Sequence, residues 1–259
     1  MHLEFTIPLL GFLYGAALII GGFSKRAQVR QFKTMSSAPI GSSAAGTRTL
    51  ISGKAYSPNP VISPVSKEPC VFYTNNTERK LSSQEKNKAY QWESGGTETS
   101  GGFFIRDDSG TALVVPTPQS LDIQKPELTV TEESAFSDCK EFATKRSERL
   151  IRADETITLL GTPRPLKDFM GYLRMNSQLG MNPDFLNELL RLENAPGSSA
   201  MPCFFGSGLE KVTDQTLDGY VAGLGSSASF SIPAGTLIAA ASAAFLLYAL
   251  KNTAQPSAF

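Results

Sequence analysis

The sequence predicts an α+β protein in which a β-rich, barrel-like or sandwich-like domain carries a helical hairpin insertion and is flanked by two transmembrane helices. Two charge-free segments of 19 residues, Phe5–Phe23 and Ile232–Leu250, lie near the two ends. Between them, short apolar runs alternate with turn residues, as in Gly101–Val115, and this pattern is typical of strands. Pro165–Glu193 instead shows apolar residues at helical spacing.

Composition excludes several classes of function. The 259 residues hold 24 basic and 24 acidic side chains, and this balance argues against a nucleic-acid-binding protein. The three cysteines, Cys70, Cys139 and Cys203, are too scattered for a disulfide framework, so we expect buried free thiols. The one histidine is His2, so the body of the chain cannot build a Ser-His-Asp or Cys-His pair, or a histidine-rich metal site.

The first charge-free segment is long enough to span a membrane. At 1.5 Å per residue, Phe5–Phe23 covers about the ~30 Å hydrocarbon core of a bilayer. A cleaved signal peptide is the alternative, but no basic residue precedes the segment and no clear small-x-small cleavage site follows it. We therefore predict a retained transmembrane helix with its basic flank over residues 1–30, and a Ser-, Ala- and Gly-rich linker over residues 31–48, with an extension of the helix into the N-terminal part of the linker as the alternative.

The second segment, Ile232–Leu250, is rich in alanine, so a buried core helix is the alternative. The preceding stretch Gly223–Ser231 is rich in Gly and Ser, reads as a flexible connection, and favours the membrane. We predict a linker over residues 225–231, a transmembrane helix over residues 232–251 and a tail over residues 252–259.

Basic residues set the expected topology. Lys25, Arg26, Arg30 and Lys33 follow the first segment, and the positive-inside rule places this flank in the cytoplasm. Lys251, beyond the second segment, argues weakly the other way. We expect an integral two-pass membrane protein with a cytoplasmic middle domain and both termini on the opposite side.

Small residues recur at four-residue spacing in both segments. Gly11 and Gly15 form such a row in the first, and Gly235, Ala239 and Ala243 form one in the second. These rows let helix backbones approach closely in lipid. We expect the two helices to pair either with each other or with those of a second copy. In the second case the protein would be a homo-oligomer.

The β-rich domain is predicted over residues 49–224. The hairpin Gly101–Val115 is expected at its centre, since Asp107 and Gly110 are residue types that suit a tight turn. The other expected strands are Thr49–Tyr56, Pro69–Asn75, Met201–Phe205, and a second hairpin of Arg146–Ile151 and Thr156–Gly161. Trp92 is expected to anchor the charged run around it to the core, and Glu132–Ala143 to form an amphipathic helix.

A helical hairpin is predicted over residues 165–195. Asn182 supplies a helix cap and Pro183 a first-turn proline between its two helices. The apolar stripes either pack on the β-rich domain, which we favour, or form a docking surface for a protein partner. The candidate partner surface consists of Phe169, Leu173, Phe185 and Leu189.

No catalytic constellation is apparent from the spacing of reactive residues. Asp107-Asp108 and Asp154-Glu155 are adjacent carboxylates, and adjacent strand residues point to opposite faces, so neither pair suits general acid–base catalysis. Turn chemistry explains both pairs. We therefore predict no catalytic residue, no metal site and no cofactor, and a chain that is not an enzyme.

Several stretches, taken in order with the flanking apolar segments, resemble the GIDE family of membrane proteins, which includes mitochondrial outer-membrane E3 ubiquitin ligases. The family layout is a membrane helix, a β-rich GIDE domain beside the membrane, and a second membrane helix. The matching stretches are Ser52–Ala55, Pro69–Tyr73, the pattern of Phe104, Asp108 and Gly110 running into Val114 and Val115, and Glu148–Ile151 with Ile157–Gly161.

The resemblance does not carry ligase activity with it. The ligases of the family end in a RING finger that holds two zinc ions on about eight Cys and His ligands, and three Cys with one His cannot supply these. The chain therefore resembles RING-less members, and we expect a membrane-anchored interaction or scaffold protein that binds the bilayer and an unidentified protein partner. The alternatives are an accessory subunit of a ubiquitin-like or proteolytic membrane quality-control system, and an enzyme that uses Asp107, Asp108 or Asp154 without histidine.

Overall fold

The protein has an α+β fold, seen in a computed structural model that describes residues 3–35, 37–81, 91–125, 128–134, 142–176, 181–197 and 200–253. The chain divides into two compact units, which we name the helical unit (Met1–Ser36 with Leu217–Phe259) and the β-rich unit (Ser37–Thr216). Both helices of the first unit are long and apolar enough to cross a membrane. The predicted α+β class and the two apolar helices are thus confirmed.

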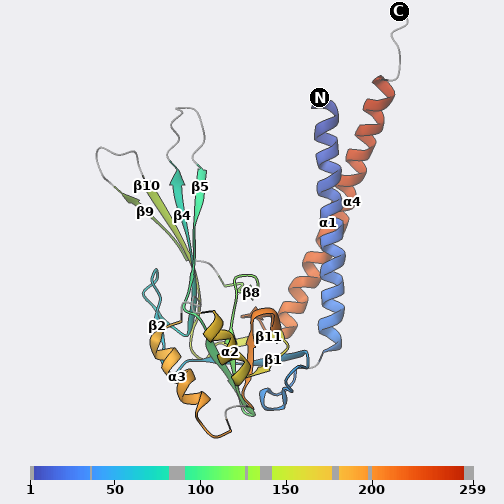
Figure 1. Cartoon of the computed structure of the whole chain (residues 1–259). Helices are drawn as coiled ribbons and strands as arrows, with labels where there is room; N and C mark the ends of the chain where they lie inside the picture. Colours follow the sequence, from blue (N-terminus) through green and yellow to red (C-terminus); the bar gives the residue numbers. More distant parts are fainter. Residues whose placement is uncertain are drawn as a thin grey trace, which may run out of the picture. The chain divides into compact units, whose positions relative to one another are not determined.

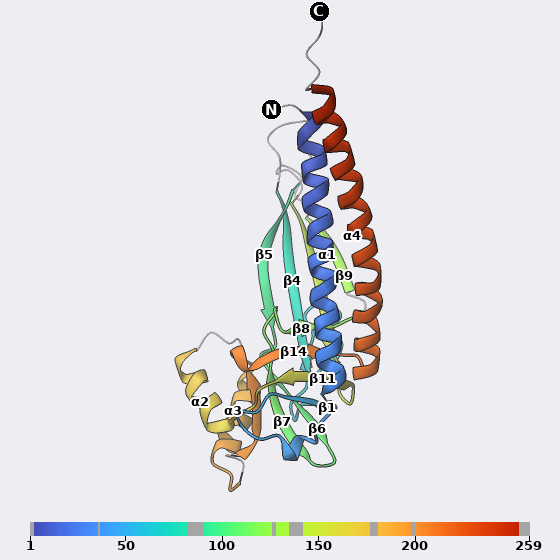
Figure 2. The same cartoon turned by 90° about the vertical axis from the view of Figure 1, so that its right-hand side faces the viewer.

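The helical unit consists of α1 (Leu3–Thr34) and α4 (Leu217–Thr253), which lie side by side and antiparallel (Figure 2). The predicted linker over residues 225–231 is wrong, because these residues belong to α4. Ala228 within them is fully buried, and Ser227 Oγ accepts a hydrogen bond of 2.5 Å from Lys25 Nζ. Tight packing against α1 holds this Gly- and Ser-rich stretch in a helix. The predicted linker over residues 31–48 begins too early, because α1 continues to Thr34.

The β-rich unit contains a mixed eight-stranded sheet with the strand order β12-β13-β7-β6-β1-β11-β14-β8. Neighbouring strands are antiparallel except for β13 with β7 and β14 with β8. The strands are β1 (Thr49–Tyr56), β6 (Phe103–Asp107), β7 (Gly110–Val115), β8 (Leu121–Asp122), β11 (Thr156–Gly161), β12 (Arg164–Pro165), β13 (Pro202–Phe205) and β14 (Leu209–Thr213).

A second, four-stranded antiparallel sheet has the order β5-β4-β10-β9, and Figure 1 shows its strands running together away from the larger sheet. Its strands are β4 (Phe72–Leu81), β5 (Gln91–Thr99), β9 (Leu128–Ser134) and β10 (Phe142–Ile151). The short strands β2 (Val61–Ile62) and β3 (Pro69–Cys70) pair with each other. A barrel or sandwich arrangement of these sheets stays a prediction.

The predicted hairpin Gly101–Val115 is confirmed as β6 and β7, near the middle of the eight-stranded sheet. Asp107 closes the turn: its Oδ1 accepts hydrogen bonds from Ser109 N, Ser109 Oγ and Gly110 N at 2.8, 2.6 and 2.9 Å. Its Oδ2 accepts from Ile40 N at 2.9 Å, which ties the 3-10 helix η1 (Ile40–Ser42) to the hairpin tip.

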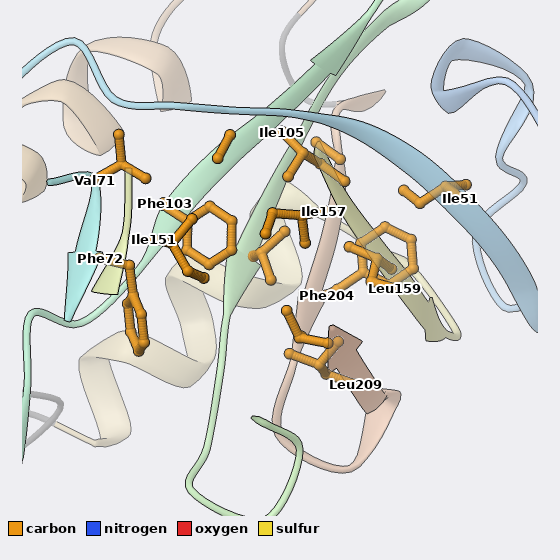
Figure 3. Close-up of a cluster of buried hydrophobic side chains, with 14 of the residues drawn as sticks. Ile51, Val71, Phe72, Phe103, Ile105, Ile151, Ile157, Leu159, Phe204 and Leu209 are labelled. Atoms are coloured by element: carbon orange, nitrogen blue, oxygen red, sulfur yellow. The ribbon is translucent and has the colours of Figure 1, made fainter. Parts of the chain in front are cut away.

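Strand β6 sends its side chains into two separate cores, because successive strand residues point to opposite faces. Phe103 and Ile105 are fully buried in the first core, which Figure 3 shows. Phe104, between them, is buried in the second core. The second core lies under α2 (Leu166–Met175) and α3 (Pro183–Glu193), so the predicted helical hairpin is confirmed and covers one face of the sheet around β6, β7 and β13. Asn182 Oδ1 accepts from Asp184 N at 2.8 Å and caps α3, as predicted.

The second predicted hairpin is wrong in its pairing. β10 pairs with β4 and β9, whereas β11 pairs with β1 and β14, so the two strands belong to different sheets. The turn between them is held by β1: Asp154 N donates to Ala55 O, and Ala55 N donates to Glu155 O, both at 2.8 Å. Asp154 takes a positive φ of 62° here, so the chain turns a corner rather than folding back on β10.

Two further predictions are wrong in the described residues. Residues 132–134 and 142–143 of the predicted helix Glu132–Ala143 lie in β9 and β10, and the rest of it, with Cys139, lies outside the described residues, as does His2. Trp92 does not anchor its strand to the core. It lies in β5, opposite Lys80 of β4, and its side chain is 42% exposed. Aromatic character misleads at Trp92 because residues Trp92–Glu98 of β5 are all exposed.

Asp107 should make the β-rich unit sensitive to acid. Burial raises the pKa of this carboxyl, but the hydrogen bonds from Ile40, Ser109 and Gly110 outweigh burial and hold the pKa below its ordinary value. Such a carboxyl contributes stability above its unfolded pKa of about 4, and this contribution is lost as the pH falls through the lower, folded pKa. Between about pH 5 and pH 2, we expect the melting temperature of the wild type to fall more steeply than that of Asp107→Asn.

The matched control is Asp108→Asn, since Asp108 is exposed and makes no hydrogen bond or ion pair within the described residues. Its melting temperature should follow the wild-type slope, as read by circular dichroism of the full chain in detergent micelles. Parallel slopes for the wild type and Asp107→Asn would contradict the role given to the hairpin carboxyl.

Candidate membrane anchor and partner-binding surface

The contact between α1 and α4 keeps one register over most of the helical unit. As the residue number in α1 rises from Gly11 to Phe32, its contact in α4 falls from Ser242 to Tyr220. A β-carbon built on Gly11 would lie 2.5 Å from Ser242 Oγ, and the rings of Phe32 and Tyr220 meet edge to face at 5.4 Å. Lys25 with Ser227 lies between these two contacts.

Glycines make this close approach possible. A β-carbon on Gly15 would lie 2.7 Å from both Ala239 N and Gly235 O, and one on Gly235 would lie 2.6 Å from Gly15 O. Backbone atoms cannot move aside as a flexible side chain can, so any larger residue at either position pushes the helices apart. Gly11, Gly15, Gly235 and Ala239 thus meet at the helix contact, and Ala243 is half-buried.

A seven-residue recurrence underlies this contact and was missed in the sequence. On α1, Pro8, Gly15 and Gly22 are buried and Val29 is half-buried; on α4, Ala228, Gly235 and Ala249 are buried and Ser242 is half-buried. A seven-residue spacing is that of a coiled coil, in which one face stays turned toward the partner helix. The four-residue rows capture part of this face only. Gly22, whose β-carbon would lie 2.5 Å from Ile232 Cγ1, belongs to it as well.

The open part of the β-rich unit is the four-stranded sheet. Residues Trp92–Glu98 of β5 are all exposed, so both faces of this strand meet solvent. Within the described residues, β5 pairs with β4 alone and β9 with β10 alone, which leaves two free strand edges. A free edge presents backbone N–H and C=O groups that can pair with another chain.

The predicted partner surface on the helical hairpin lies mostly in the core. Phe169 and Leu189 are fully buried and Phe185 is 3% exposed, all three in the second core with Phe104. Phe104 and Phe185 meet with ring centroids 5.3 Å apart. Only Leu173 is partly exposed. These side chains pack the hairpin onto the sheet instead of facing a partner, because the apolar stripe of each helix is the face turned inward.

A hollow of about 410 Å³ lies beside the hairpin tip and is lined by Ser52, Gly53, Lys54, Arg106, Asp107, Asp108 and Thr156. Both carboxylate oxygens of Asp107 accept hydrogen bonds, Oδ1 from the turn and Oδ2 from η1, so this carboxylate is not placed as a general base. The guanidinium of Arg106 lies 3.2 Å from Asp154 Oδ1 and over the ring of Tyr56. In the part of the chain that the structure describes, no three His, Cys, Asp or Glu residues lie close enough together to hold a metal ion.

Glu148 forms a buried polar centre that the sequence did not reveal. Its side chain is 1% exposed, and its carboxylate accepts hydrogen bonds from Ser63 Oγ, Val65 N and Ser66 N at 2.9, 3.1 and 2.9 Å. These bonds fold the proline-containing loop between β2 and β3 over β10. The sequence predicts a strand over Arg146–Ile151, but nothing in this run indicates that Glu148 faces inward.

Replacing Gly15 with valine should separate α1 from α4. The Gly11 β-carbon would lie 3.5 Å from Ser242 Cβ, a distance that suits a disulfide, so the pair Gly11→Cys with Ser242→Cys reports on the contact. On oxidation in membranes, with Cys139 changed to serine, we expect this pair to form a disulfide within one chain. Adding Gly15→Val should reduce the yield several-fold.

Gly21→Val is the matched control, because nothing lies within 4 Å of a β-carbon at Gly21. It should leave the yield of the disulfide unchanged. A disulfide that joins two chains instead of closing within one would show that the small residues pack a second copy.

Comparisons with known proteins give no relative for this chain. No protein-family model matches it, and no curated protein or solved structure is significantly similar to it.

Proposed function

We propose that the chain is a two-pass membrane protein whose β-rich unit binds a protein partner next to the bilayer, as an interaction or scaffold protein. The observation that carries the membrane part is the register of α1 and α4. Gly22, at the end of the first charge-free segment, faces Ile232, at the start of the second. Gly11, in the middle of the first, faces Ser242, in the middle of the second.

The two charge-free segments therefore lie at the same level along the helix pair. Each is about 28 Å long at 1.5 Å per residue, close to the ~30 Å hydrocarbon core. Two helices that cross the same bilayer must align their apolar segments in this way, so the register supports membrane insertion. The charged ends then fall outside the hydrocarbon, with Lys25 beyond Phe23 on one side and Lys251 beyond Leu250 on the other.

The four-stranded sheet supports the interaction part. Among the described residues, β5 and β9 each have one edge without a neighbouring strand, and a partner that adds a strand there gains backbone hydrogen bonds. In the hollow beside the hairpin tip, by contrast, Asp107 and Arg106 are already engaged within the unit, Asp107 in the turn and Arg106 in an ion pair with Asp154. We place partner binding at the sheet, with the β-rich unit on the basic, cytoplasmic side of the membrane.

The resemblance to RING-less GIDE proteins, with a barrel-like or sandwich-like domain, belongs to the same proposal. The stretches that carry it are neighbours in the fold: Ser52 pairs with Thr158, Lys54 with Arg106, and Tyr73 with Leu150. They supply residues to the first core, and Phe104 and Val115 to the second, so the pattern that carries the resemblance is one of packing. Partner choice then falls to parts outside these stretches.

Chemical labelling in intact, sealed membranes tests the anchor and its topology. The native Cys70 is a poor target, since burial raises the pKa of its thiol to about 12 and keeps it protonated. Asp108→Cys places a thiol at an exposed, unpartnered position of the β-rich unit. We expect the protein to stay in the membrane after alkaline extraction, and an impermeant maleimide to label Asp108→Cys from the cytoplasmic side alone.

Cysteines at positions 3 and 253, the two ends of the helix pair, serve as the control and should react from the opposite side alone. Release of the chain by alkaline extraction would overturn the two-pass anchor. Labelling of all three positions from one side would overturn the topology.

Site-specific photo-crosslinking tests the partner surface. A photoreactive residue at Glu93 in β5 or at Thr129 in β9 should form adducts with another protein in native membranes, since both side chains are exposed beside free edges. The same residue at Lys167, exposed on α2, is the control and should form few. Adducts at Lys167 alone would move the partner to the helical hairpin, and turnover of a substrate by the purified protein would contradict a purely binding function.

A further inference from the structure

The stretch of α1 that follows the charge-free segment is strongly basic. Between Phe23 and Met35 the sequence has Lys25, Arg26, Arg30 and Lys33 and no acidic residue. The part of α4 at the same level of the helix pair is residues 217–231, and it contributes a single acid, Asp218, at its far end. The positive charge is therefore left almost unbalanced within the helical unit.

Three of these basic side chains share one flank of α1. Lys25 faces α4 and donates to Ser227 Oγ, so it belongs to the helix contact. Arg26, Arg30 and Lys33 follow at spacings of four and three residues, which places them one above the other on an α-helix. All three are exposed, and none has a hydrogen-bond or ion-pair partner among the described residues.

Their depth matches the polar layer of a bilayer. Counted from Phe23 at 1.5 Å per residue, Arg26 lies about 5 Å beyond the hydrocarbon, Arg30 about 10 Å and Lys33 about 15 Å. The headgroup layer is about 5–7 Å thick on each side of a membrane. Arg26 thus lies within it, whereas Arg30 and Lys33 lie beyond it, and their long side chains can extend back toward the phosphate groups.

We propose that this flank of Arg26, Arg30 and Lys33 binds the phosphate groups of anionic phospholipids in the adjacent leaflet. The inference rests on the membrane insertion proposed above. A guanidinium presents a planar fork of N–H donors that matches two phosphate oxygens, which favours arginine at the two inner positions. Bound lipid supplies the charge that the helical unit itself lacks, and it would hold the helix pair at a fixed depth.

Lipid binding to the full chain in nanodiscs tests the proposal. The discs contain phosphatidylcholine with about one-fifth phosphatidylserine, and native mass spectrometry reads the ratio of the two lipids that stay bound. Each basic residue near a charged surface contributes about fivefold in binding. We expect serine lipid to be enriched on the wild type, and enrichment to be lost in the triple variant Arg26→Gln, Arg30→Gln, Lys33→Gln. Single variants should rank in the order of depth, with Arg26→Gln the most damaging.

The control removes the same charge elsewhere. Lys54→Gln, Lys67→Gln and Lys167→Gln together change exposed lysines of the β-rich unit and should leave the enrichment at the wild-type level. The double variant Arg26→Lys, Arg30→Lys keeps the positive charge but lacks the planar N–H donors of the guanidinium, and it should retain part of the enrichment. Both leaflets of a disc have the same composition, so an inverted topology does not alter the ratio.

Three results would overturn the proposal: equal ratios for the wild type and the triple variant, an equal loss in the lysine control, or full competition by inorganic phosphate at a concentration that leaves the discs intact. The last would assign the flank to a soluble phosphate. Failure of the chain to enter the discs at all is a different outcome, because it would overturn the membrane anchor proposed above.

Discussion

The register of α1 against α4 is the constraint on which the helical unit depends. It is fixed where Gly15 and Gly235 let two backbones approach so closely that a β-carbon on either would clash with the other's carbonyl oxygen. Once that contact is set, Gly22 must face Ile232 and Lys25 must face Ser227. The alignment of the two charge-free segments follows from this one approach.

The β-rich unit depends in a similar way on the alternation of β6. Phe103 and Ile105 point into one core and Phe104 into the other, so a slip of one residue would exchange the two faces of the sheet. Asp107 fixes the strand's end by closing the turn and binding η1. The sheet is thereby covered on both faces near β6, whereas β5 and β9 in the other sheet each have one edge without a neighbour in the described part of the chain.

Local patterns in the sequence were sufficient for much of this fold. The hairpin at Asp107, strand β1, the two helices of the hairpin insertion and the apolar segments each carry their signal within a few residues. Local patterns failed where contacts with residues far away in the sequence determine the local structure. Residues 225–231 are helical because α1 packs on them, β10 and β11 part because β1 holds the turn between them, and Glu148 is buried because a loop about 80 residues earlier folds over it. The apolar residues of the candidate partner surface were correctly predicted to lie on helices. Whether such a stripe faces the core or solvent depends on the sheet beneath it, which the local sequence does not contain.

The edge-to-face contact of Phe32 with Tyr220 has a consequence for the stability of the part of the chain between them. The chain leaves α1 after Thr34 and enters α4 at Leu217, so this contact closes Ser37–Thr216 into a loop. A chain held at both ends gains less conformational entropy when it unfolds than a free chain does, as it would if a disulfide joined its ends. The helix pair therefore acts on the β-rich unit as a noncovalent cross-link, and a substitution in the contact between α1 and α4 would lower the stability of the β-rich unit.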